Sequence, residues 1–399
     1  MTAPTSSSRP SKLLGAFSRT AEPARTCPRP NPGALALAGT AALLGGAALA
    51  AGGFALHTTT YAALDRWRAE RAGFRTAHTL VNGYDLHFAE GPDNGPALLL
   101  VPGQGSDLWN YARAMRELAA DFHVFAIDLP GHGESEFDPD LYHGPVLGEL
   151  VADFAEGVIG EQVVVAGHSS GGLVAAWMAA SRPDVVAAVI LEDPPFFSSE
   201  HPRALRTWNH VDLASAAHAF VSQPQDADEG ENTDPEWTDD FVEFYLEHGA
   251  FFALFEGLEP TLRASGLRKR EANPEAPVTW PWMPPAMNEL MRGLDSYDPA
   301  FGEAFYTGAF HEHFDHELTL AAIGVPALLV ACDWEYSDDG ILRAAMDADD
   351  ADRAADLIPD VEFVRVKSGH NFHFAHPREY AAAVRDFLSE AIDEVEVFA

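Results

Sequence analysis

A serine within residues 163–174 has the surroundings of an activated nucleophile. The segment reads V-V-V-A-G-H-S-S-G-G-L-V, with Ser169 at the centre of G-H-S-S-G, between an apolar strand-like run and an apolar helix-like run. A strand that turns sharply into a helix leaves such a serine strained and exposed at its tip. Gly167 and Gly171 are expected there because side chains would clash in so tight a turn. The chemistry expected of Ser169 is attack on a carbonyl group.

A serine needs a base to remove its proton. On this kind of turn the partners follow in the order serine, acid, histidine. His370, in S-G-H-N after the last expected strand and before the last expected helix, is therefore the predicted base. His373 and His376 follow closely and are interpreted as packing or surface residues.

The acid that orients the histidine should follow a strand of the sheet. Asp333 is favoured because it directly follows the apolar run 326–331, and Glu335 in the same loop is an alternative. Asp193, after the run that ends at Leu191, is a third address. In a chain this acidic, each of them could equally be a solvated loop carboxylate.

Two backbone N–H groups should stabilise the oxyanion that forms when the serine attacks. One is expected from Ser170, directly after the nucleophile. The other is expected from Gln104 in the loop Pro102-Gly-Gln-Gly105, where Gly103 would allow close approach of the backbone.

Four motifs in order give the chain a resemblance to the α/β-hydrolase superfamily, in its serine-nucleophile, capped, esterase- or lipase-like form. They are the loop 102–105, the segment Asp128-Leu-Pro-Gly-His-Gly-Glu-Ser135, the Gly167–Gly171 turn and Gly369-His370. The resemblance implies that His132 is structural rather than a second base. One departure is Pro102, which stands where the family often has histidine.

The elements that must position these residues follow an α/β pattern. Short apolar runs alternate with helical patterns, which predicts a mostly parallel sheet covered by helices on both faces. Asn82-Gly83 between two strand-like runs predicts a hairpin. The alternation stops over residues 198–320, which predicts a helical cap inserted between late strands. Its aromatic residues are expected to form its core or line an apolar pocket: Phe251, Phe252, Phe255, Trp280 and Trp282.

The predicted organisation has six parts. A tail at residues 1–32, rich in Ser and Pro, is expected to be disordered. Residues 33–56 carry no charge and are predicted to be a transmembrane or signal segment. A linker follows at 57–77, and the core occupies 78–197 and 321–399 around the cap. Arg and Lys before the apolar segment predict a catalytic domain outside the cytoplasmic membrane, either anchored or secreted.

The charge of the chain excludes some partners. The 399 residues include 25 Lys and Arg against 61 Asp and Glu, for a formal net charge of −36. Nucleic acid binding needs a basic surface, so a nucleic-acid partner is excluded. Cys27 and Cys332 form no zinc spacing. The segment His311-Glu-His-Phe-Asp-His316 fits no standard zinc motif either, so neither a metal nor a cofactor is predicted.

The expected activity is hydrolysis of a carboxylic ester with an apolar group, through an acyl-enzyme on Ser169. Amide, lactone or carbon–carbon bond hydrolysis and perhydrolysis would use the same residues and stay open, because a fold does not choose among them. A non-catalytic binding protein on the same scaffold is the alternative from another class. The expected partner is a small ester-like molecule, and the oligomeric state is left open.

Overall fold

The computed structural model describes residues 32–223 and 238–394 of the chain. Its contacts divide the chain into two units, residues 1–53 and 54–399. The described part of the first unit is the beginning of helix α1 (Pro32–Arg71). The predicted disordered tail lies outside the described residues, apart from its last position.

The N-terminal stretch of the second unit is helical. Residues 57–77, expected to be a linker, continue α1 as far as Arg71 and contribute the buried side chains of Tyr61, Ala69 and Phe74. Among the residues that the structure describes, no helix combines the length and the apolar character that crossing a membrane requires. The predicted transmembrane segment at 33–56 is therefore not supported.

An eight-stranded sheet forms the centre of the second unit, in the order β1-β2-β4-β3-β5-β6-β7-β8. β1 and β2 form the predicted hairpin, β2 is also antiparallel to β4, and every other neighbouring pair is parallel. The strands are β1 (Arg75–Val81), β2 (Tyr84–Glu90), β3 (Ala97–Val101), β4 (His123–Ile127), β5 (Val163–His168), β6 (Val186–Glu192), β7 (Ala327–Ala331) and β8 (Val361–Arg365).

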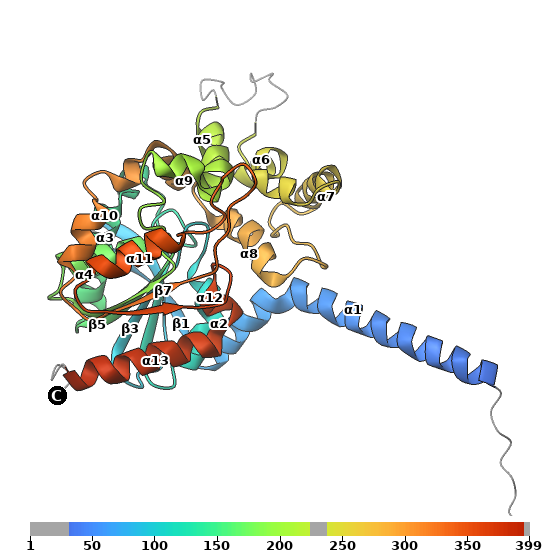
Figure 1. Cartoon of the computed structure of the whole chain (residues 1–399), viewed down its shortest axis with the longest axis horizontal. Coiled ribbons are helices and arrows are strands. Elements are labelled where there is room, and N and C mark those ends of the chain that lie inside the picture. The colour runs from blue at the N-terminus through green and yellow to red at the C-terminus, as the bar shows by residue number, and fades with distance from the viewer. Residues whose placement is uncertain (1–31, 224–237, 395–399) are drawn as a thin grey trace, which may run out of the picture. The chain divides into compact units, whose positions relative to one another are not determined.

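Helices cover both faces of this sheet (Figure 1). Successive side chains of a strand point to opposite faces. In β5, Val163 and Val165 join one apolar cluster and Val164 and Ala166 join the other. The first cluster includes side chains of α3 (Gly144–Phe154), α4 (Ser170–Ser181), α10 (His316–Ala322) and α11 (Ala348–Leu357); the second includes α2 (Ala112–Leu118), α12 (Phe372–Ala375) and α13 (Pro377–Glu394). The predicted α/β fold is confirmed.

A helical cap lies between β6 and β7, as predicted. Phe251, Phe252 and Trp280 form its core, and Phe255 is half-buried. Trp282 does not belong to that core, since 49% of its surface is exposed. The helices between the two strands, besides α10, are α5 (Ser215–Val221), α6 (Phe241–His248), α7 (Glu259–Ala272), α8 (Pro285–Gly293) and α9 (Pro299–Thr307).

Helix α4 begins in close contact with the backbone of neighbouring strands. A Cβ atom at Gly171 would lie 2.3 Å from the carbonyl oxygen of Val101 in β3 and 2.4 Å from that of Pro102. A Cβ atom at Gly167 would lie 2.2 Å from the carbonyl oxygen of Gly171. These partners are backbone atoms, which cannot rotate away. The two glycines therefore fix the distance between β5, α4 and β3.

We expect Gly171→Ala to lower the free energy of unfolding by about 1–3 kcal/mol, because the new methyl group meets fixed backbone. The matched control is Gly157→Ala, where a Cβ would meet nothing within 4 Å. Alanine has the higher helix propensity, so the control should be neutral or slightly stabilising. Urea denaturation of both variants measures the difference. Equal stabilities would contradict the close-contact argument.

Candidate active site

Ser169 lies at the turn between β5 and α4 in a strained backbone conformation. Its φ is 54° and its ψ is −125°. A positive φ is uncommon for a residue other than glycine, and such strain is concentrated at functional sites. Ser169 is thus held at the tip of the sharp turn that the sequence predicts.

His370 pairs with Asp193. Nδ1 of His370 lies 2.6 Å from Oδ2 of Asp193. The other carboxylate oxygen, Oδ1, accepts a hydrogen bond of 3.1 Å from the backbone N–H of Cys332. Asp193 directly follows β6 and is 3% exposed, and His370 is 37% exposed. A buried acid thus holds Nδ1 of the histidine and leaves Nε2 for another partner.

The prediction that Asp333 pairs with this histidine is wrong. The side chain of Asp333 is exposed. In the part of the chain that the structure describes, only its backbone is held in place, by a hydrogen bond from its N–H to the carbonyl oxygen of Ser368. Glu335 lies at the cavity described below, with a carboxylate oxygen 3.7 Å from Nη1 of Arg343. Asp333 and Glu335, in the loop after β7, are both exposed. Asp193, which directly follows β6, is buried and has a φ of 46°.

The charges near His370 change its proton affinity. Burial by itself lowers the pKa of His370, but the hydrogen bond and charge of Asp193 and the charge of Glu192 outweigh it. The pKa of His370 is therefore raised above the ordinary histidine value.

A cavity of about 480 Å³ joins Ser169 and His370. Among the hydrogen bonds of the described residues, none links the Ser169 hydroxyl to His370, and catalytic bonds of this kind often tighten only when substrate is bound. Most of the other lining residues are apolar or small and belong to the cap or the loops beside it, including Leu213, Ala214, Leu254, Leu290 and Phe305.

The predicted oxyanion loop lies directly against the serine. A Cβ atom at Gly103 would lie 2.7 Å from Cβ of Ser169, so only glycine allows this approach. In the described residues, neither the N–H of Gln104 nor that of Ser170 makes a turn or loop hydrogen bond to another backbone group. The Gln104 side chain bonds instead to the hydroxyl of Tyr297, at 2.6 Å. Two donors therefore remain for a ligand beside Ser169.

The loop after β4 supports this arrangement. The backbone N–H of Gly105 donates a hydrogen bond of 3.0 Å to Nε2 of His132, which is buried. Burial lowers the pKa of His132 to about 4, so it stays neutral and can accept this bond. The contacts fit the structural role that the sequence predicts for His132.

A chain of buried polar side chains, which the sequence did not predict, lies behind the histidine. Glu192 and His373 are fully buried, and Nδ1 of His373 lies 2.9 Å from the Glu192 carboxylate. Nε2 of His373 lies 2.7 Å from Oδ1 of Asn110, whose amide nitrogen donates to Glu289 in α8 at 2.9 Å. The hydroxyl of Tyr61 in α1 donates to the other Glu289 oxygen. These buried polar side chains thus link α1, the cap and Glu192, the residue next to Asp193.

Histidine and acidic side chains form two compact groups in the described residues: His168, Glu192 and His373, and His78, His87 and Glu134. In the first group, His373 is engaged as above, and Nε2 of His168 donates to the carbonyl of His370 at 3.0 Å. The segment 311–316 contributes to neither group.

Comparison with curated proteins gives partial matches. The chain is 35% identical over 136 residues to a pimeloyl-[acyl-carrier protein] methyl ester esterase of Chromobacterium violaceum, which covers 34% of this chain and 49% of that protein. It is 31% identical over 156 residues to a chloroplastic pheophytinase of Arabidopsis thaliana, over 31% and 32% of the two chains. The chain thus matches half or less of the length of these relatives.

Solved structures share the fold over most of the chain. A bacterial membrane phospholipase A, described as a virulence factor, has a TM-score of 0.57 at 24% identity and covers 89% of this chain and 98% of its own. The carboxylesterase CesB of Bacillus subtilis has a TM-score of 0.56 at 16% identity, with 84% and 99% covered. At these identities the likeness shows the fold alone.

The family model described as the alpha/beta hydrolase fold matches residues 96–377. This range includes the predicted oxyanion loop, the turn at Ser169, Asp193 and His370, together with all of the cap. The chain belongs to the alpha/beta hydrolase family.

Proposed function

We propose that the protein is a serine hydrolase that cleaves carboxylic esters through an acyl-enzyme on Ser169. The observation that carries this proposal is the strained Ser169 in the lining of a cavity that His370 also lines, with the buried Asp193 2.6 Å from Nδ1 of His370. A nucleophile, a base and a group that orients the base are the parts that such chemistry requires.

In the proposed mechanism, the Ser169 hydroxyl attacks the ester carbonyl while Nε2 of His370 accepts its proton. Asp193 keeps Nδ1 protonated and stabilises the imidazolium that forms. The N–H groups of Gln104 and Ser170 bind the oxyanion, and His370 then protonates the leaving alcohol. Water, activated by the same histidine, releases the acid and restores Ser169.

The lining of the cavity favours a substrate with an apolar acyl or alcohol group. Side chains such as Leu213, Leu290 and Phe305 surround a space large enough for a small-molecule ligand. The name of one relative, a methyl ester esterase, describes an enzyme that acts on an ester bond and agrees with this substrate class.

A fluorophosphonate probe tests the nucleophile. We expect the folded protein to be labelled, and Ser169→Ala to abolish the labelling, because the probe reacts only with an activated serine. Mass spectrometry should place the adduct on the peptide that contains Ser169. Ser170→Ala, which keeps the nucleophile and replaces its neighbour, should still be labelled. A folded protein that is not labelled, or an adduct that survives in Ser169→Ala, would refute the proposal.

The identity of the acid is tested by two matched substitutions. Asp193→Asn should lower kcat by about 10⁴-fold, because the histidine loses the partner that fixes its tautomer. Asp333→Asn should leave kcat within about twofold of the native value, because its side chain is exposed. Hydrolysis of p-nitrophenyl butyrate measures both. A large loss of kcat in Asp333→Asn with little change in Asp193→Asn would contradict the assignment and identify Asp333 as the acid.

The pH profile tests the electrostatics around the base. His370 must be neutral to accept a proton, so kcat/KM should fall as the pH drops through its raised pKa. Glu192→Gln removes a charge that raises this pKa, so the acidic limb should move to lower pH. Glu256→Gln, at an exposed position, is the control and should leave the limb in place. A shift to higher pH in Glu192→Gln would contradict the assignment.

A further inference from the structure

We propose that His78, His87 and Glu134 form a binding site for one divalent transition-metal ion such as Zn²⁺. The residues belong to β1, β2 and the loop after β4, and none of them lines the active-site cavity. One ligand atom from each residue can be chosen so that all three lie within 4.8 Å of one another.

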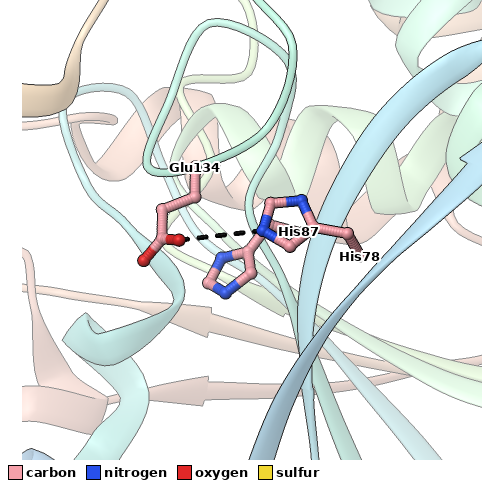
Figure 2. A group of neighbouring side chains, drawn as sticks. All are labelled: His78, His87 and Glu134. Carbon is pink, nitrogen blue, oxygen red and sulfur yellow. Dashed lines mark ion pairs between the residues drawn. The ribbon is translucent and has the colours of Figure 1, made fainter.

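The two histidines are direct neighbours across the hairpin. His78 is the register partner of His87, which places both side chains on one face of the sheet. Their ring centroids are 4.8 Å apart. Figure 2 shows the Glu134 side chain reaching toward the two rings from the neighbouring loop, with the ion pair to His78 dashed. That pair joins Nε2 of His78 to a Glu134 carboxylate oxygen at 3.7 Å.

The buried carboxylate of Asp128 is hydrogen-bonded to two of the three proposed ligand residues, His87 and Glu134. Oδ2 of Asp128 lies 2.7 Å from Nδ1 of His87 and accepts a 3.0 Å hydrogen bond from the backbone N–H of Glu134. Ser135 adds a second connection, because its hydroxyl accepts from the backbone N–H of His87 at 2.9 Å and donates to the Asp128 carbonyl. The loop and β2 are thus fixed to one another before any ion binds, as good metal sites require.

His78 also has a carboxylate partner. Nδ1 of His78 lies 3.3 Å from Oδ1 of Asp85, so its Nε2 is the nitrogen left to face Glu134. Hydrogen bonds between carboxylates and metal-binding histidines fix the ring and make it a better ligand. His87 is 2% exposed, while the side chains of His78 and Glu134 are 46% and 59% exposed. The two exposed side chains are therefore free to close around an ion that arrives from solvent.

The donor set decides the class of ion. Zn²⁺ binds imidazole and carboxylate at about 2.0–2.2 Å, and two histidines with one glutamate form a known ligand set that leaves a position for water. Mg²⁺ and Ca²⁺ prefer all-oxygen sites and are disfavoured here. The small rearrangement needed lies in the two exposed side chains. An ion there would tie the edge hairpin β1–β2 to the loop 128–135.

Isothermal titration of the untagged full-length chain with ZnCl₂ tests the site. We expect one ion per chain, with affinity reduced at least tenfold in His78→Ala and in Glu134→Gln, since loss of a ligand or its support costs about 10–100-fold. Both positions are exposed, so these variants should fold. The outcome that would overturn the proposal is unchanged zinc affinity in both.

Two histidines elsewhere provide matched controls. His123 lies 3.0 Å from Glu90 and 3.9 Å from Asp93, but it belongs to neither of the compact histidine and acid groups found in the described residues. His313 is 89% exposed beside Glu312. His123→Ala and His313→Ala should bind zinc within about twofold of the native chain. An equal loss in these variants would show diffuse surface binding and would also refute the site.

Thermal unfolding provides a readout that does not involve activity. An ion that binds the folded chain alone raises its Tm as the metal concentration increases. We expect ZnCl₂ to raise the Tm of the native chain and of His123→Ala, and to leave that of His78→Ala unchanged. Fluorophosphonate labelling of Ser169 should be the same in all of these variants, which separates this inference from the proposed hydrolase activity.

Discussion

The candidate site depends on the contact of backbone with backbone at the start of α4. Gly167 and Gly171 let β5, α4 and β3 approach to distances at which no side chain fits. Because these elements pack so closely, the turn between them is sharp, with Ser169 at a positive φ and the loop with Gly103 directly against it. The positions of Ser169 and of the loop with Gly103 both depend on this one constraint.

Much of this could be predicted from the sequence. The glycine spacing predicts the tight turn at Ser169, and the order of strands and helices predicts the sheet. Both are confirmed, and the loop with Gly103 and His370 lie close to Ser169 as expected. Asp193 was only the third candidate for the acid, because several carboxylates follow sheet strands and the sequence does not show which of them is buried. Asp193 accepts a bond from Cys332, a residue of the loop where the acid was expected. That contact joins the ends of two neighbouring strands, and the spacing of residues along the sequence does not reveal it.

The buried chain behind the histidine was missed for a related reason. Glu192, His373, Asn110 and Glu289 come from four separate elements and follow no motif. A buried carboxylate is costly unless it is paired, and both carboxylates of this chain are paired. Glu192 has His373, and Glu289 has Asn110 and the guanidinium of Arg292, whose Nε lies 2.8 Å away. Glu192, which belongs to this chain, and Asp193, which does not, both raise the pKa of His370 and so favour its imidazolium form.

Tyr61, at the end of this row of buried polar side chains, bears on where the folded unit begins. Tyr61 lies before the first strand, yet its hydroxyl satisfies an oxygen of Glu289. Asp65 in the same helix bonds to Arg113 of α2 at 2.5 Å. A recombinant chain trimmed to the first strand would remove one of the donors to the buried Glu289, which keeps Asn110 and Arg292, and would leave Arg113 without the carboxylate of Asp65. The natural boundary for expression of the hydrolase therefore lies on the N-terminal side of Tyr61, within α1.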